Sequence, residues 1–252
     1  MSHYAKLSSI GNELDRYRKK PEGEQLLEET CTFAAKYIQD VCYTNVSASL
    51  DTIAQEVRNR LREKHPNHSI FSTSDKTFSY WKTNNIEDNR WNDTESTHIM
   101  DTLQEYIFRT FYIRARIPPF SPEDIKYLCI DYVLQSKVGE DIIVNTIFHS
   151  VARRLGLRCD VLYIEDGFCI FWKSKLVTNN FENAGCFYTQ KYFPGYRVID
   201  NLSEYMSVRP FAITITKMLE SITHIVRQFI MRHIINALQL IEVKCIIQKP
   251  LI

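Results

Sequence analysis

The most regular hydrophobic pattern in the chain lies between residues 142 and 155. Apolar side chains recur there every three or four positions, which is the spacing that lines one face of an α-helix. The pattern predicts a central, deeply buried helix, and Gly156 directly after it is a typical C-terminal stop. The apolar positions are Ile143, Val144, Ile147, Phe148, Val151, Ala152 and Leu155.

A β-ribbon is predicted directly after this helix. The runs Cys159 to Ile164 and Phe168 to Trp172 are rich in aromatic and β-branched residues, and Asp166-Gly167 between them favours a type I′ turn. Residues 186–192 and 196–199 have the same character and predict a second ribbon. Together these strands suit an antiparallel sheet of about four strands over the central helix.

Amphipathic helices are predicted throughout the first half of the chain. One stripe begins at Leu26, and a second helix capped by Ser47 or Ser49 ends before Pro66. Residues 70–91 mix bulky aromatic side chains with polar ones, which favours short helices and turns held by aromatic anchors.

Two more helices are predicted before the central one. Thr94 or Ser96 opens the first. Ser121-Pro122 opens the second, whose apolar stripe runs toward Gly139. The connection from Gln135 to Asp141 is short, which makes Gly139 a backbone position rather than a side-chain one. Residues 1–25 are polar and predict a flexible arm.

The central segment resembles a known family. Val151-Ala-Arg-Arg-Leu-Gly156, with Gly139 before it and Phe168 after it, is similar to the SirB-type transglutaminase-like domain of the F-box only protein 21 family. A second similarity lies upstream, in His65-Pro-Asn-His68 and Asn85 to Trp91. The resemblance covers about residues 50–200. It implies an α+β fold in which a helical N-terminal part packs on a papain-like core of a central helix and a small antiparallel sheet.

The expected domain organisation follows from this resemblance and from the hydrophobic pattern. After the arm, residues 26–116 form a helical region and residues 117–210 form the transglutaminase-like core. A broad apolar stripe then predicts a C-terminal helical segment at 211–252.

The chain departs from the family at the positions that carry chemistry. The resemblance implies a nucleophilic Cys at the start of the central helix, a His on the following strand and an Asp on the next one. Ile143 and Gly167 occupy the first two positions, and only Asp200 falls where the third member is expected. Ile143 cannot attack a substrate and Gly167 cannot accept a proton, so we expect a degenerate triad and no catalysis.

Composition narrows the class of protein. Residues 1–252 carry a net charge of +1 with the basic residues scattered, which argues against nucleic-acid binding. The seven cysteines show no zinc-site spacing and suit reduced thiols, so we expect no metal, no cofactor and a cytoplasmic or nuclear protein. The N-terminus lacks a signal peptide, and charges interrupt the apolar run at 222–247, so neither secretion nor a membrane span is expected.

Two functions of different classes remain open. The first is a non-catalytic protein-interaction or substrate-recognition module linked to ubiquitin-ligase-dependent protein turnover, although residues 1–60 contain no F-box pattern. The second is a cysteine-dependent transglutaminase or peptidase with a relocated nucleophile, for which Cys159 and Cys169 are candidates and His149 is a possible base.

A retained groove would serve the first function. Its candidate lining combines the degenerate positions with acidic and aromatic neighbours, and the alternative is that Ile143 fills the cleft as additional core. The candidate groove residues are Asp141, Ile143, Tyr163, Gly167, Trp172 and Asp200.

Overall fold

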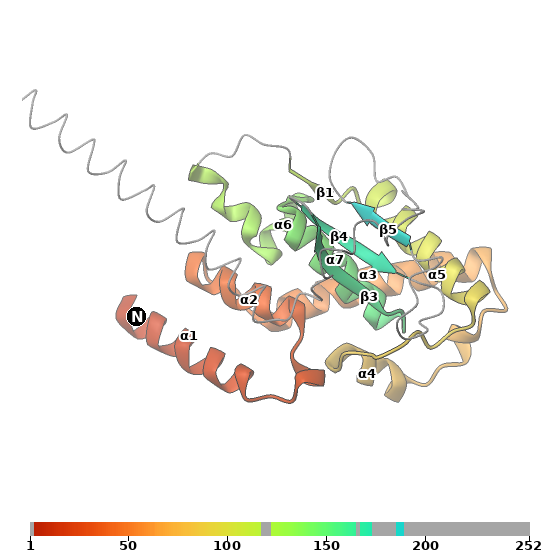
Figure 1. The fold of residues 1–252 in the computed structure, drawn as a ribbon, viewed down its shortest axis with the longest axis horizontal. Coiled ribbons are helices and arrows are strands. Elements are labelled where there is room, and N and C mark those ends of the chain that lie inside the picture. The colour runs from red at the N-terminus through yellow and green to blue at the C-terminus, as the bar shows by residue number, and fades with distance from the viewer. Residues whose placement is uncertain (1–2, 117–121, 165–166, 173–184, 189–252) are drawn as a thin grey trace, which may run out of the picture.

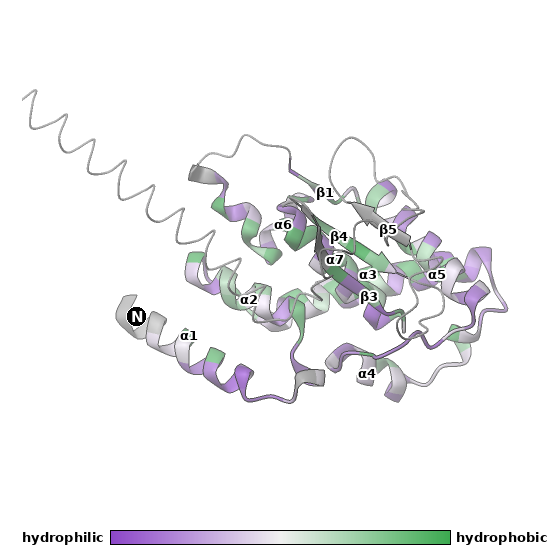
Figure 2. Ribbon diagram, in the orientation of Figure 1, coloured by the Kyte–Doolittle hydropathy of each residue, from purple (hydrophilic) through white to green (hydrophobic). Residues whose placement is uncertain are grey.

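The computed structural model describes residues 3–116, 122–164, 167–172 and 185–188 (Figure 1). Helix α7 (Asp141–Arg154) packs against the sheet formed by β3 (Cys159–Ile164), β4 (Gly167–Trp172) and β5 (Gly185–Tyr188). It also packs against α2 (Leu27–Ile38), α3 (Tyr43–Lys64) and α6 (Ile130–Ser136). Figure 2 shows hydrophobic residues concentrated on α7 and β4. The predicted central helix is confirmed, because every apolar residue of its stripe is buried.

The hairpin is confirmed, and its second strand begins one residue earlier than predicted. Strands β3 and β4 pair antiparallel with Ile164 opposite Gly167, so Gly167 belongs to the strand. Strand β5 pairs antiparallel with β4, which gives the order β3-β4-β5. The predicted strand at 196–199 and the helical segment 211–252 lie outside the described residues.

Residues 1–25 were predicted to be a flexible arm, but the structure has helices in this segment. Helix α1 (His3–Arg18) and the short 3-10 helix η1 (Glu22–Glu24) lie within this segment. Ile10 and Tyr17 are buried although they stand in a polar sequence. The Tyr17 hydroxyl donates to the Leu26 carbonyl oxygen at 2.9 Å, so contacts with α2 hold α1 in place.

Helix α3 begins earlier than predicted. Cys42, rather than Ser47 or Ser49, occupies the N-cap position. The predicted apolar stripe from Leu50 to Leu61 is buried, and the helix ends at Lys64, directly before the His65-Pro66 pair. The apolar period therefore located the helix, and the cap chemistry did not locate its first turn.

The aromatic segment consists of short elements, as predicted. They are η2 (Ser69–Ser72) and α4 (Asp75–Thr83), followed by α5 (Asp93–Gln104), which is capped by the Asn92 side chain rather than by Thr94 or Ser96. A π-helical turn, η3 (Glu105–Thr110), follows. Trp91 donates from Nε1 to the Leu155 carbonyl oxygen at 2.8 Å, which ties this segment to the end of α7.

The helix predicted after Ser121 is interrupted. The 3-10 helix η4 (Pro122–Leu128) and α6 are separated by Cys129, whose backbone is extended. Strand β1 (Arg114–Ala115) pairs in parallel with β2 (Val138–Gly139). A Cβ atom at Gly139 would lie 2.5 Å from Val133 Cγ2, which confirms that only glycine fits this close approach.

Gly156 ends α7 for a related reason. Its φ of +76° is a left-handed conformation that strongly favours glycine. A side chain there would also meet the ring of Trp81 at 2.8 Å. The predicted helix stop is therefore confirmed and is reinforced by packing.

A buried ionic cluster joins α7 to the N-terminal helices. Arg153 and Arg154, at the end of α7, both pair with the carboxylate of Glu28 on α2. Ser150 donates to the same carboxylate at 2.8 Å, and Arg154 also pairs with Asp51 on α3 at 2.8 Å. Glu28, Arg153 and Arg154 are at most 4% exposed. The Arg-Arg pair of the sequence motif therefore cross-links three helices.

Candidate functional site

The start of α7 is the position where the resemblance predicts a nucleophile. Ile143 is fully buried there and packs in the hydrophobic core. This placement agrees with the alternative in which Ile143 fills the cleft rather than lining an open groove. An aliphatic side chain in this position has neither a lone pair to attack with nor a proton to give.

Asp141 connects this helix start to the sheet. Its Oδ1 accepts a hydrogen bond from the Ile142 backbone N–H at 2.8 Å, and its Oδ2 accepts one from the Phe168 N–H at 3.0 Å. Gly167 precedes Phe168, so the structure brings the predicted positions Asp141 and Gly167 together. The carboxylate holds β4 against the helix.

The other predicted groove residues do not complete a site in the described part of the chain. Trp172 lies at the opposite end of β4, paired with Cys159, and is largely buried. The side chain of Tyr163 and the whole of Asp200 lie outside the described residues. The third member of the degenerate triad therefore stays a prediction.

A charged group at the start of α7 was missed from sequence. Arg116 lies 2.8 Å from the Asp124 carboxylate and 3.9 Å from that of Glu140. Burial, together with the nearby charge of Asp141, raises the pKa of Glu140 to about 7. Nothing in the sequence pattern indicates this shift, because η4, β1 and the α7 start meet only in the fold.

The described thiols divide into buried ones and one exposed one. Cys159 and Cys169 are buried, and burial raises the pKa of Cys159 well above its usual value. Burial likewise raises the pKa of Cys31 and of Cys129 to about 12. Cys42 is exposed at the N-cap of α3, and a hydrogen bond with Thr44 lowers its pKa. The relocated-nucleophile alternative therefore finds both candidate thiols buried, with the raised pKa of Cys159 favouring its unreactive, protonated form.

Polar side chains follow one face of α7 at intervals of four residues. Asp141, Asn145, His149 and Arg153 make this series, which brings them to one side of the helix. Asn145 is fully buried, and within the described part of the chain neither of its amide atoms has a hydrogen-bond partner. The four-residue spacing can be read from the sequence, but the apolar residues between these positions dominate the pattern, so the sequence alone predicted only a buried helix.

His149 has one occupied and one unoccupied ring nitrogen. Its Nδ1 lies 2.6 Å from the Cys159 carbonyl oxygen, which can only accept, so Nδ1 carries the proton. Its Nε2 is therefore an acceptor, and this buried atom has no hydrogen-bond partner among the residues that the structure describes. Burial and the nearby charge of Arg153 lower the pKa of His149, which keeps the ring neutral.

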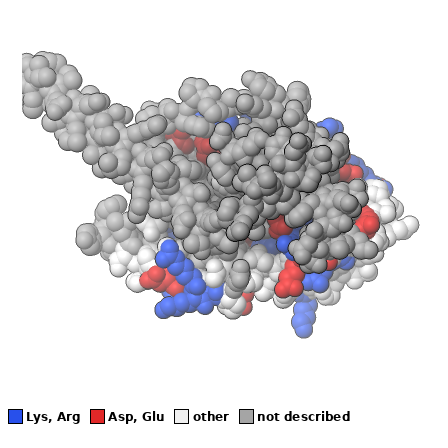
Figure 3. Space-filling model, viewed as in Figure 1, with Lys and Arg blue, Asp and Glu red and all other residues white. Residues whose placement is uncertain are grey.

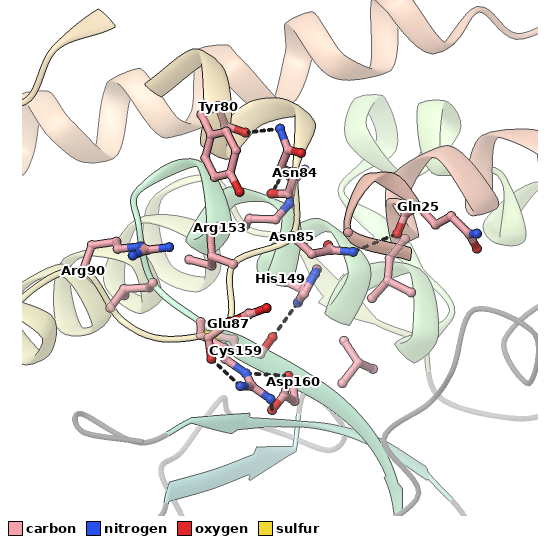
Figure 4. Close-up of a pocket in the computed structure, with 16 residues that line it drawn as sticks. Gln25, Tyr80, Asn84, Asn85, Glu87, Arg90, His149, Arg153, Cys159 and Asp160 are labelled. Atoms are coloured by element: carbon pink, nitrogen blue, oxygen red, sulfur yellow. Dashed lines mark hydrogen bonds and ion pairs between the residues drawn. The ribbon is translucent and has the colours of Figure 1, made fainter. Parts of the chain in front are cut away.

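A cleft of about 740 Å³ lies beside His149 (Figure 4). Its walls come from the start of α2, the end of α4 with the loop after it, α7, and the first residues of β3. Gln25, Asn84 and Asn85 contribute amides, and Arg90 and Asp160 contribute charged groups. None of the described residues that line this cleft belongs to the predicted groove, whereas His149 and Cys159, the candidate base and one candidate thiol of the relocated-nucleophile alternative, both do line it.

Comparison with known proteins identifies the family. The family described as the Transglutaminase-like superfamily matches residues 44–185, which run from the first turn of α3 to the first residue of β5. The chain belongs to this superfamily. No curated protein and no solved structure matches it.

The superfamily match includes the two features that the resemblance emphasised. Helix α7 and the β3–β4 hairpin both lie within the matched residues. The match also begins before residue 117, so it includes much of the helical region that precedes the expected core.

No helix in the part of the chain that the structure describes is long and apolar enough to cross a membrane.

Proposed function

We propose that this transglutaminase-like domain binds a protein partner without catalysing a reaction on it, and that it does so in ubiquitin-ligase-dependent protein turnover in the cytoplasm or nucleus. The observation that carries the proposal is the complete burial of Ile143 at the start of α7. A superfamily member that uses this position for catalysis needs an accessible thiol there. Here the position belongs to the core.

The groups around Ile143 support a structural role for this end of the helix. Both carboxylate oxygens of Asp141 accept hydrogen bonds from backbone N–H groups, one at the helix start and one in β4. Gly167 lies in a strand and offers no side chain to activate a nucleophile. The polar contacts that remain at this site therefore hold elements together.

The surface chemistry favours a protein partner over a nucleic acid. Where described residues are visible in Figure 3, mainly along its lower and right edges, acidic and basic side chains lie next to one another. Nucleic-acid binding would need a continuous basic surface. The connection to ubiquitin ligases rests on the sequence resemblance to the F-box only protein 21 family.

Two assays on the full chain test this proposal. The first measures incorporation of a fluorescent amine into casein and hydrolysis of a peptide library, comparing the wild type with Cys159→Ser and Cys169→Ser. We expect no turnover above background in any of the three proteins. Turnover that is lost in either Ser variant, and kept in a Cys42→Ser control, would establish the cysteine-enzyme alternative.

The second assay is proximity labelling in cells with the full chain fused to a biotin ligase. We expect ubiquitin-ligase subunits to be labelled above the level of the free biotin ligase. Their absence, after the fusion has been shown to be folded and expressed, would remove the ubiquitin-ligase part of the proposal.

A further inference from the structure

The cleft beside His149 has the size of a ligand site. Its volume of about 740 Å³ lies within the range of pockets that enclose ligands in proteins. Leu27, Ile86 and Val161 give it apolar walls, and the side chains labelled in Figure 4 converge on it from four separate elements. Its shape is fixed by a hydrogen bond from the Asn85 N–H to the Gly23 carbonyl oxygen at 2.6 Å.

The residues that line the cleft are partly polar and carry little net charge. Arg153 is paired with Glu28 and Arg158 with Asp160, so their charges are compensated. The loop after α4 adds one carboxylate, Glu87, and one guanidinium, Arg90. A polyanion or polycation would meet no excess of opposite charge here. The amide nitrogens of Gln25, Asn84 and Asn85 already donate to backbone carbonyl oxygens, so these side chains are held in place at the cleft.

One wall of the cleft is the edge of the described sheet. Among the described strands, β3 lies at the end of the sheet and pairs with β4 alone, and its residues Cys159, Asp160 and Val161 line the cleft. The backbone of an edge strand can pair with an extended segment from another chain. The edge begins at Cys159, whose carbonyl oxygen is already bound by His149.

His149 adds a requirement for a donor. Its Nε2 is a buried acceptor that has no partner among the described residues, and His149 is one of the residues that line the cleft. An unpaired buried acceptor is unfavourable, and a ligand that donates to it removes this cost. A peptide N–H group supplies such a donor.

We propose that this cleft binds an extended peptide segment of the partner protein, laid along β3 and donating a hydrogen bond to His149 Nε2. This inference rests on the proposed function and locates its binding site. It places the site beside the middle and end of α7, away from Ile143 at the start of that helix.

The test selects peptides and then maps their site. The immobilised full chain is panned against a random linear peptide library, and enriched peptides are synthesised with a fluorophore and titrated by fluorescence polarisation. Tyr80→Ala removes an exposed aromatic side chain from the cleft rim, and Tyr37→Ala removes one of similar exposure, 46% against 51%, from α2 as a matched control. His149→Asn can keep a donor toward the Cys159 carbonyl oxygen while removing the Nε2 acceptor.

We expect Tyr80→Ala and His149→Asn each to weaken peptide binding about tenfold, the size expected for one lost contact of this kind, with Tyr37→Ala unchanged. His149→Gln, which can place a polar atom near the Nε2 position, should bind more tightly than His149→Asn. Enrichment of no peptide, or equal affinity of the wild type and Tyr80→Ala, would overturn the inference. Because Tyr80 is exposed, its variant keeps the test decisive even if His149→Asn fails to fold. Proximity labelling that still detects ubiquitin-ligase subunits would show that the proposed function survives without this site.

Discussion

Replacing Glu28 with glutamine removes one negative charge from a buried network while keeping nearly the same side-chain shape. Glu28 is fully buried and faces both Arg153 and Arg154. Burial by itself raises the pKa of Glu28, but the two guanidinium groups outweigh it and lower that pKa from 4.5 to about 2. The variant would leave two buried arginines with less compensating charge.

The expected loss of stability follows from this pKa. A shift from 4.5 to about 2 corresponds to about 3 kcal/mol of folding free energy. Removing one partner of a buried ion pair costs a similar amount, about 3 to 5 kcal/mol. We therefore expect Glu28→Gln to lower the free energy of unfolding by about 3 kcal/mol.

Urea titration of the full chain at neutral pH measures this loss, with the slope of the transition checked for constancy. Glu29→Gln is the matched control, because Glu29 is the next residue and pairs with the partly exposed Lys20. The control should cost less than about 1 kcal/mol.

The pH dependence gives an independent check. Since the folded-state pKa of Glu28 lies below its unfolded value, its contribution is fully present above about pH 4.5 and is lost as the pH falls toward 2. Wild type and Glu28→Gln should therefore converge in stability at low pH. A loss under about 1 kcal/mol at neutral pH, or a difference that persists in acid, would refute a buried, charge-compensated cluster.

The remaining predictions use single substitutions and simple measurements. Phe148→Ala should destabilise by about 3 to 5 kcal/mol in urea titration, because Phe148 is fully buried and stacks on Phe108; a loss below about 1 kcal/mol would place it at the surface. Ile143→Asp should unfold the domain, as seen by loss of the thermal transition, and a folded variant that no longer binds its partner would instead restore the groove hypothesis. Among the described thiols, Cys42 should react first with a thiol reagent at neutral pH and Cys42→Ser should abolish this fast phase, whereas a fast phase that persists would point to a buried cysteine. Glu140 has a folded-state pKa raised to about 7, so its stabilising contribution is complete below about pH 4.5 and is lost as the pH rises through 7; Glu140→Gln should therefore melt higher than the wild type above pH 7, and an unchanged melting profile would argue against the shift.

The sequence by itself determined the elements whose cause is local. The apolar period between residues 142 and 155 located α7, and Gly156 located its end, because both effects act within a few turns of one helix. The β-branched and aromatic runs located β3 and β4 for the same reason. Gly139 was identified as a backbone position because its neighbours along the chain already restricted the connection.

Local patterns failed where a partner came from a distant part of the chain. Residues 1–25 looked like an arm because few of them are apolar, and α1 became visible only through the contacts of Tyr17 with α2. The helix predicted after Ser121 is interrupted at Cys129, which packing decides and periodicity does not show.

The tertiary structure alone decided the chemistry of the candidate cleft. Glu28 meets Arg153 across 125 residues of sequence, and the His149 tautomer is fixed by a carbonyl oxygen on another element. Hydrogen bonds and desolvation act over a few ångströms in space, so their effects on charge and protonation depend on neighbours that the linear pattern does not reveal. Sequence could show that Ile143 and Gly167 cannot supply a nucleophile or a base, and only the fold shows the cleft beside His149.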